Sequence, residues 1–276
     1  MTSAKIWHVC EGSQQIERVD MLSGAPRSTF RHNDQVVTFM PEHKVVRHER
    51  RDKPTGFPQF LQGTSNRIAD FYGVQTGGVE RVAGVEADIV TFQPKDTLRF
   101  GYRVWTERKQ GLVVKLQTLD IDGKVLEQAA FSELQLDAPL KMDKLVQMMG
   151  KVDGYRVEKT ALVKTTASAE GWNIKLPVAG FKPVSCYKRP LSGQPGTAGS
   201  LAAGDEPLQW IFSDGLASVS VFVEPMDKHR HDKESTLSLG ATQTLTRQIN
   251  KHWITVMGEV PLATLGLFAN SIERKK

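Results

Sequence analysis

The sequence predicts a mainly β protein of the α+β class, built from two domains. Short segments in which apolar and polar residues alternate recur along the chain, and Gly, Asp and Asn cluster between them as turn residues. Helical spacing of apolar residues is confined to about Pro139–Met149 and the segment after Pro261. With 276 residues, of which 39% are hydrophobic and 24% charged, the chain is long enough to bury two cores and is neither disordered nor fibrous.

A meander of three antiparallel strands is expected in the middle of the chain. Leu98, Phe100, Tyr102 and Val104 alternate with polar or small residues and predict a half-buried strand. A polar loop ending at Gly111 and a turn at Asp120–Gly123 follow. The second and third strands are expected near 112–116 and 124–136.

Two further hairpins are expected upstream of this meander. One pairs Gln35–Met40 with Lys44–Arg47, and the other pairs Val79–Ala83 with Glu86–Phe92 across Gly84. Between them, Lys53–Tyr72 mixes Pro and Gly with apolar residues, which indicates a loop and a short helix.

The predicted domain division places a large domain at 1–150, a linker at 151–170 and a small domain at 171–276. The linker is inferred because Lys159–Gly171 is rich in Lys, Thr, Ala and Ser. In the small domain we expect a long exposed loop (192–206), a hairpin turning at Asp214-Gly215, and two strands near 240–246 and 253–260. A helix should begin after Pro261 and continue to the end of the chain.

No pattern of catalytic residues is visible in the sequence. His229–Asp232 could hold a metal ion, but adjacent histidines in a polar loop are more often solvated. Ser213-Asp214-Gly215 would suggest a hydrolase only with His252 nearby, and a hairpin turn explains it better. The sequence shows no pair of carboxylates of the kind used in general acid–base catalysis. We therefore expect no enzyme, cofactor or metal.

Charge and apolar segment length limit the possible partners. The net charge of +5 favours an anionic partner without choosing among nucleic acid, lipid and protein. The densest basic cluster, Arg47–Lys53, contains acidic residues and is either a solvated loop or an anion-contacting patch.

No apolar stretch approaches the ~20 residues of a membrane span. Residues Met1–Val9 contain no secretory signal, which alone would indicate the cytoplasm.

Cys10 and Cys186 lie in different predicted domains. In a reducing compartment both would stay thiols, whereas in an oxidising one a disulfide could link the two domains. Spacing alone leaves both alternatives open.

Motifs in both halves resemble one family. In the first half they are GVERVAGVEA (Gly78–Ala87) and RFGYRVW (Arg99–Trp105), and in the second they are SDGLASVSVFVEP (Ser213–Pro225) and GEVP (Gly258–Pro261). In order and spacing they resemble the periplasmic regulators of the envelope-stress sigma factor, the RseB/MucB type, from about Lys5 to Ile272.

The resemblance implies both a fold and a function. It implies a large domain similar to the lipoprotein-carrier fold, a curved antiparallel sheet or half-barrel around an apolar cavity, followed by a small sheet-and-helix domain. It implies a periplasmic protein that binds the periplasmic part of a membrane anti-sigma factor and shields it from proteolysis. Lipid, lipopolysaccharide or a mislocalised lipoprotein would release it. No nucleic acid is expected as a partner, and self-association is possible.

The candidate cavity residues are the apolar side chains of the meander and its neighbours: Leu98, Phe100, Tyr102, Val104, Phe71 and Phe92. They could line such a cavity or simply fill a dry core. The region that matches the family starts near Ile6–Val9, after the family's signal peptide, first helix and first strand. We therefore expect an N-terminally truncated large domain with an unpaired strand edge. A periplasmic lipid or lipoprotein carrier is the alternative function, although it leaves the small domain without a role.

Overall fold

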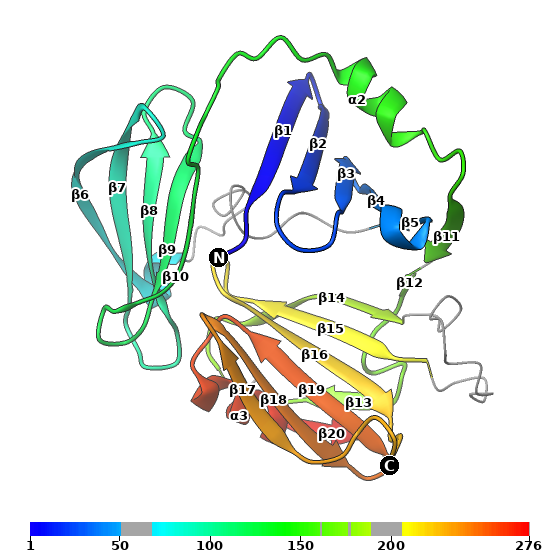
Figure 1. Cartoon of the computed structure of the whole chain (residues 1–276). Helices are drawn as coiled ribbons and strands as arrows, with labels where there is room; N and C mark the ends of the chain where they lie inside the picture. The colour runs from blue at the N-terminus through cyan, green and yellow to red at the C-terminus, as the bar shows by residue number, and fades with distance from the viewer. Residues whose placement is uncertain (51–67, 161, 176–177, 189–205, 276) are drawn as a thin grey trace. The chain divides into compact units, whose positions relative to one another are not determined.

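The computed structural model describes residues 1–50, 68–160, 162–175, 178–188 and 206–275, and these are mostly β-strands (Figure 1). This confirms the mainly β class with antiparallel sheets. The chain forms two compact units that are interleaved in sequence. The described residues of the first unit lie within Met1–Pro54 and Gln135–Leu162. Those of the second lie within Thr55–Leu134, Val163–Lys188 and Ser200–Lys276.

The first unit contains a six-stranded sheet in the order β1-β2-β3-β4-β5-β11. Its strands are β1 (Ala4–Glu11), β2 (Gln14–Met21), β3 (Ser28–His32), β4 (Gln35–Met40), β5 (Val45–Arg50) and β11 (Arg156–Thr160). The predicted hairpin at β4–β5 is confirmed, with the short 3-10 helix η1 (Pro41–His43) at its turn. β11 runs parallel to β5, whereas the other pairs are antiparallel.

Helix α2 (Met142–Met149) covers one face of this sheet. Met142, Leu145 and Met149 recur at helical spacing and are buried against the strands. The sheet contributes the apolar residues of alternating strand positions to the same core: Ile16, Phe30, Val37, Phe39 and Val46.

The second unit contains a five-stranded antiparallel sheet in the order β10-β9-β8-β7-β6. Its strands are β6 (Tyr72–Val82), β7 (Val85–Pro94), β8 (Gly101–Glu107), β9 (Val113–Leu119) and β10 (Val125–Ala130). The predicted hairpin across Gly84 and the meander are confirmed. Helix α1 (Ile68–Phe71) precedes β6; the rest of the predicted loop before it, residues 51–67, lies outside the described residues.

A seven-stranded sheet follows in the same unit, in the order β12-β14-β15-β16-β19-β18-β17. Its strands are β12 (Val163–Lys164), β14 (Lys182–Lys188), β15 (Leu208–Ser213), β16 (Ser218–Pro225), β17 (Ser235–Leu239), β18 (Thr242–Ile249) and β19 (His252–Gly258). Helix α3 (Leu262–Asn270) packs on β18 and β19 (Figure 1). The predicted antiparallel sheet with a C-terminal helix is thus confirmed, and with seven strands it is the largest sheet among the described residues. The predicted loop at 192–206 lies almost entirely outside the described residues.

Two local predictions are corrected by the structure. The C-terminal helix ends at Asn270, because Ile272 is buried and lies in a short strand, β20 (Ile272–Arg274), that pairs with β13 (Trp172–Ile174). The half-buried strand is β8, and it is covered on both faces: Tyr102 and Val104 are buried on one, and Trp105 on the other.

Within the described part of the chain, the longest helix has nine residues, and no helix is long and apolar enough to cross a membrane.

Candidate binding surfaces

A buried ion pair connects the segment before β8 with the seven-stranded sheet. The side chains of Arg99 and Asp214 are both 0% exposed, and Arg99 Nε donates to Asp214 Oδ2 at 2.7 Å. The guanidinium also donates to the Asp96 carboxylate and to the backbone carbonyl of Ala179. A desolvated ion pair is stable only when such additional hydrogen bonds satisfy it. This arrangement meets that condition.

Asp214 organises the turn between β15 and β16 as well as the ion pair. Its Oδ1 accepts hydrogen bonds from the backbone N–H groups of Leu216 (3.0 Å) and Ala217 (2.8 Å). The hydroxyl of Tyr72 donates to Oδ2 at 3.0 Å. Burial, followed by the charges of Tyr102 and Asp214, raises the pKa of Tyr72, so the phenol stays protonated and remains a donor.

Aromatic rings and a glycine enclose the guanidinium of Arg99. Its Cζ lies 4.5 Å from the ring centroid of Phe71 and 5.2 Å from that of Phe181. Gly180 has φ +92°, and a Cβ there would lie 2.6 Å from the Phe71 ring, so a side chain cannot fit. Arg99, Asp96, Asp214 and Tyr72 are called the buried joint below. Because it ties β6 and the β7–β8 segment to the β15–β16 turn, it fixes two sheets of the second unit to each other.

Sequence reasoning missed this joint. The alternating pattern assigned Arg99 to a polar strand face, and the Asp214 motif was explained fully by a hairpin turn, which the structure confirms. The two residues are 115 positions apart, so no local pattern could pair them.

The candidate cavity residues are packed around or near the joint. Phe92, Tyr102 and Val104 are buried in one core cluster, against which Phe71 packs. Leu98 packs instead against the core of the seven-stranded sheet, and its carbonyl accepts a hydrogen bond from Thr264 Oγ1 in α3 at 2.7 Å. Phe100 is 6% exposed. The structure therefore brings these side chains into cores, and a ligand-binding role for them stays a prediction.

The face of the seven-stranded sheet opposite its core contains two neighbouring cross-strand rows without a charged side chain. Leu245, Val256 and Val221 point into the core, so the residues that alternate with them point to the other face. One row across the strands contains Leu237, Thr244, Met257, Ser220 and Ile211. The neighbouring row contains Ser235, Thr246, Thr255, Phe222 and Gln209. These ten residues, called the neutral face below, contain no charged side chain.

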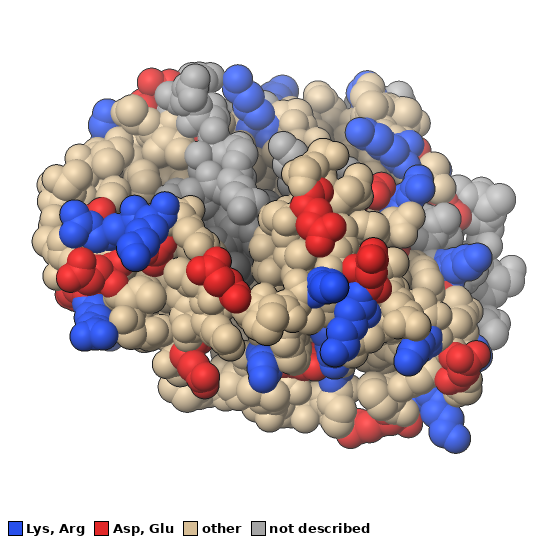
Figure 2. Space-filling view, turned by 90° about the horizontal axis from the view of Figure 1, so that it is seen from above, with Lys and Arg blue, Asp and Glu red and all other residues tan. Residues whose placement is uncertain are grey.

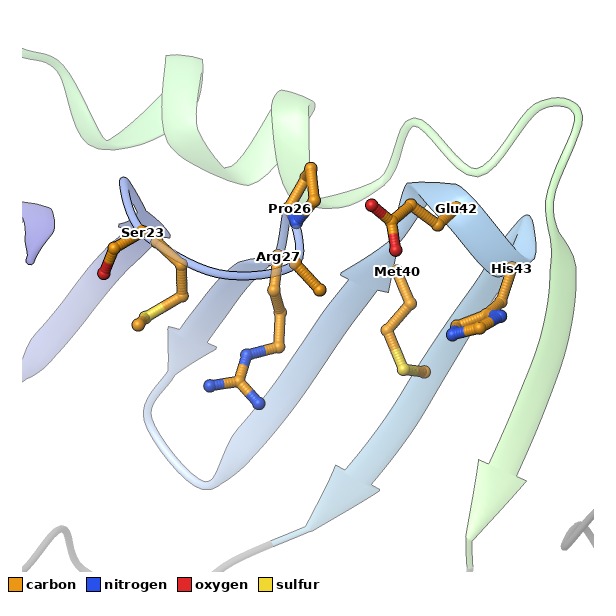
Figure 3. A pocket seen from close by; sticks show the side chains of 8 residues that line it. Ser23, Pro26, Arg27, Met40, Glu42 and His43 are labelled. Atoms are coloured by element: carbon orange, nitrogen blue, oxygen red, sulfur yellow. The ribbon is translucent and has the colours of Figure 1, made fainter. Parts of the chain in front are cut away.

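A half-open pocket of about 280 Å³ lies in the first unit, at the loop between β2 and β3 and at η1 (Figure 3). Its lining combines apolar and charged side chains: Met21, Ser23, Ala25, Pro26, Arg27, Met40, Glu42 and His43. In Figure 3, Arg27 and Met40 extend in the same direction. Because both Arg27 and Glu42 line the pocket, its charge does not favour an anionic or a cationic ligand.

The basic cluster is largely paired where the structure describes it. Arg47 contacts Glu158 at 3.3 Å and Arg50 contacts Asp34 at 3.7 Å. Residues 51–53 lie outside the described residues. On the face seen in Figure 2, basic and acidic side chains are intermixed without a large area of one sign. Among the described residues, this distribution fits a solvated strand better than a nucleic-acid surface.

Two histidines of the second unit, His231 and His252, pack against tryptophan rings. The His231 ring stacks on Trp253 with centroids 5.0 Å apart, and its Nδ1 accepts a hydrogen bond from Asp227 N at 3.0 Å. The His252 ring packs on the edge of Trp172. The described residues contain no group of three His, Cys, Asp or Glu side chains that could hold a metal ion.

The two cysteines are free thiols in the structure. Cys10 is exposed on β1, and Cys186 is buried on β14 in the core of the seven-stranded sheet. Burial, with a smaller contribution from the negative charge of Glu170, raises the pKa of the Cys186 thiol to about 11. The candidate disulfide between Cys10 and Cys186 stays one of the two alternatives that the sequence leaves open.

These environments predict unequal alkylation rates. With iodoacetamide at pH 8, Cys10 is expected to react at least ~100-fold faster than Cys186, whose thiolate fraction is about 0.001 and whose sulfur is buried. Peptide mass spectrometry over time measures both rates, and protein in guanidinium should lose the difference. If neither thiol reacted before reductant was added, the disulfide would be present instead.

Comparison with known protein families shows to which family this chain belongs. The family described as the MucB/RseB N-terminal domain matches residues 1–149, and the one described as the MucB/RseB C-terminal domain matches residues 166–273. This chain belongs to the MucB/RseB family. The resemblance inferred from the sequence motifs is therefore confirmed.

Curated members of the MucB/RseB family are regulatory proteins by name. The sigma factor AlgU regulatory protein MucB of Pseudomonas aeruginosa is 30% identical over 218 residues, which cover 75% of this chain and 62% of that protein. The sigma-E factor regulatory protein RseB of Haemophilus influenzae is 24% identical over 267 residues, covering 96% of this chain and 79% of that protein.

Solved MucB structures share the fold over the whole chain. MucB crystallised in complex with MucA(peri) matches with a TM-score of 0.69 at 24% identity, covering 100% of this chain and 89% of that chain. The MucA/MucB complex of Pseudomonas aeruginosa matches with a TM-score of 0.70 at the same identity.

Proposed function

We propose that this MucB/RseB-family chain is a periplasmic negative regulator of envelope-stress sigma-factor signalling. It binds the periplasmic part of a membrane anti-sigma factor and shields that part from proteolysis. The observation that carries this proposal is that both halves of the chain match the two parts of the family in order. Curated relatives are named sigma factor regulators, and a MucB of the same fold was solved with MucA(peri).

The architecture supports a binding role. A second sheet with a neutral face, fixed by a buried joint, provides a rigid surface for a polypeptide, whereas a simple lipid carrier has no use for it. We propose that the large domain spans 1–150, the linker 151–170 and the small domain 171–276; the end of the first matched family range at residue 149 supports a boundary near residue 150. Lipid, lipopolysaccharide or a lipoprotein acyl chain serves as the signal that weakens binding. The chain acts by occlusion and not by catalysis.

Binding and protection are measured with the purified periplasmic segment of the cognate MucA-type anti-sigma factor. Isothermal calorimetry should show a saturable complex, and the bound segment should be cleaved more slowly by the protease that degrades it. Adding lipopolysaccharide should restore cleavage. A segment that neither binds nor gains protection would contradict the proposed function.

A further inference from the structure

Strand β17 is an open edge of the seven-stranded sheet. It is the terminal strand in the sheet order and pairs with β18 on its other side (Figure 1). All five of its residues, Ser235–Leu239, are exposed. Among the described strands none pairs with its outer edge, so the outward N–H and C=O groups of β17 are available to another extended chain.

This edge lacks the features that normally prevent strand addition. Natural edge strands are protected by charged residues, proline or bulges. Charged residues lie on the other edge strands of the three larger described sheets: Lys5 and Glu11 on β1, Arg156 and Glu158 on β11, Glu80 and Arg81 on β6, Glu127 on β10, and Lys164 on β12. The ladders of β6 and β10 also contain register shifts. β17 has neither a charge nor a proline, and its five pairs with β18 are in continuous register.

Two leucines on β17 add apolar surface beside the open edge. Leu237 is 64% and Leu239 is 75% exposed, more than any other large apolar side chain in a described strand. Both point to the side of the neutral face, because Leu237 pairs with Thr244 and not with the core residue Leu245. A strand added beside them would cover both leucines.

The edge is also held in place. The turn between β17 and β18 contains Gly240, which has φ +60°, and the next backbone N–H, that of Ala241, donates to Glu127 Oε2 of β10 at 3.3 Å. The β17–β18 hairpin is therefore anchored at its tip, which lowers the entropy lost on binding.

We infer that the β17 edge is the docking site for an extended, uncharged segment of the anti-sigma partner, which joins the seven-stranded sheet as an eighth strand. The inference rests on the proposed function and names its contact surface. Main-chain hydrogen bonds to β17 provide affinity, and alternating side chains of the added strand rest on Leu237, Leu239 and the neutral face. A charged side chain at these positions would find no opposite charge in the neutral face, so the segment is uncharged there.

Lysine substitutions on the edge test this inference. The double variant Leu237→Lys, Leu239→Lys should bind the cognate anti-sigma periplasmic segment at least tenfold more weakly than the wild type by calorimetry. Both side chains are exposed, so the melting temperature should not change. The matched control is Val74→Lys, an exposed apolar residue on the β6 edge, and it should bind as the wild type does.

Hydrogen exchange gives an independent readout of strand addition. Amides of residues 235–239 should exchange more slowly in the wild-type complex than in the chain alone. The inference would be overturned if the double variant bound the segment within twofold of the wild-type affinity and the complex showed no added protection of the β17 amides. That outcome would leave the proposed function intact. No binding by the wild type would overturn both. A wild-type dimer that the double variant converts to monomer, with partner binding retained, would assign the edge to a second copy of this chain and overturn the inference.

Discussion

Replacing Arg99 with alanine is expected to lower the free energy of unfolding by about 3–5 kcal/mol. The substitution leaves Asp214, which is 0% exposed, as a buried carboxylate without its cation. It also removes the donors to Asp96 and to the Ala179 carbonyl. Urea denaturation followed by tryptophan fluorescence measures the loss, since Trp172 and Trp210 lie in the core of the same unit.

An exposed arginine provides the matched control for this prediction. Arg108 contacts Glu86 and Asp88 at 3.5 and 3.3 Å, but its side chain is 52% exposed. Solvent screens such pairs, so Arg108→Ala should cost at most about 1 kcal/mol. A double-mutant cycle with Asp214→Asn should show strong coupling to Arg99→Ala. Equal, small losses for Arg99→Ala and Arg108→Ala would show that the buried joint contributes little to stability.

The same glycine-to-alanine change is expected to have opposite effects at two nearby positions in the sequence. A Cβ on Gly258 in β19 would lie 2.3 Å from the backbone oxygen of Ser218, and the strand cannot yield without disturbing its neighbour β16. Gly258→Ala should therefore destabilise the protein toward the upper end of about 1–3 kcal/mol. Gly266 in α3 has nothing within 4 Å of its Cβ position, so Gly266→Ala should stabilise it by about 0.5–1 kcal/mol.

Thermal unfolding followed by circular dichroism distinguishes the two variants, because the melting temperature should fall for Gly258→Ala and rise for Gly266→Ala. The Gly266→Ala variant also serves as the control, because it adds the same methyl group to the same sheet-and-helix region. A Gly258→Ala variant as stable as the wild type would mean that the β16–β19 contact relaxes at little cost.

Much of the fold was predictable because its elements depend on local patterns. The turn at Asp214-Gly215 and the alternation of Val219, Val221 and Val223 define the β15–β16 hairpin in the sequence alone. The apolar spacing of Leu145 and Met149 likewise predicts α2. Residues before Gln35 gave no such prediction, although they form β1, β2 and β3. There, charged and apolar residues are mixed on both faces, and the strands are defined by pairing with their neighbours.

The candidate sites were less predictable, since they depend on distant residues. The buried joint requires Arg99 to be desolvated, and an arginine within an alternating pattern is normally expected at the surface. The sequence predicted a strand near 240–246 but did not assign β17, because Ser235–Leu239 follows a charged loop and has a weak pattern. Its position at the edge of the sheet follows from the order of seven strands, which short-range spacing does not determine.

The parallel pairing of β5 with β11 has a consequence for the order in which the chain folds during synthesis. Arg47 and Glu158, which form an ion pair across these two strands, are 111 residues apart, and the whole five-stranded sheet is made between them. A nascent chain that has reached residue 134 holds β1–β5 without β11 and without α2, so Ile16, Phe30 and Val46 lack their cover. The N-terminal sheet is therefore completed late, after a long loop has been closed, and a chaperone that holds exposed apolar surface would act on it in that interval.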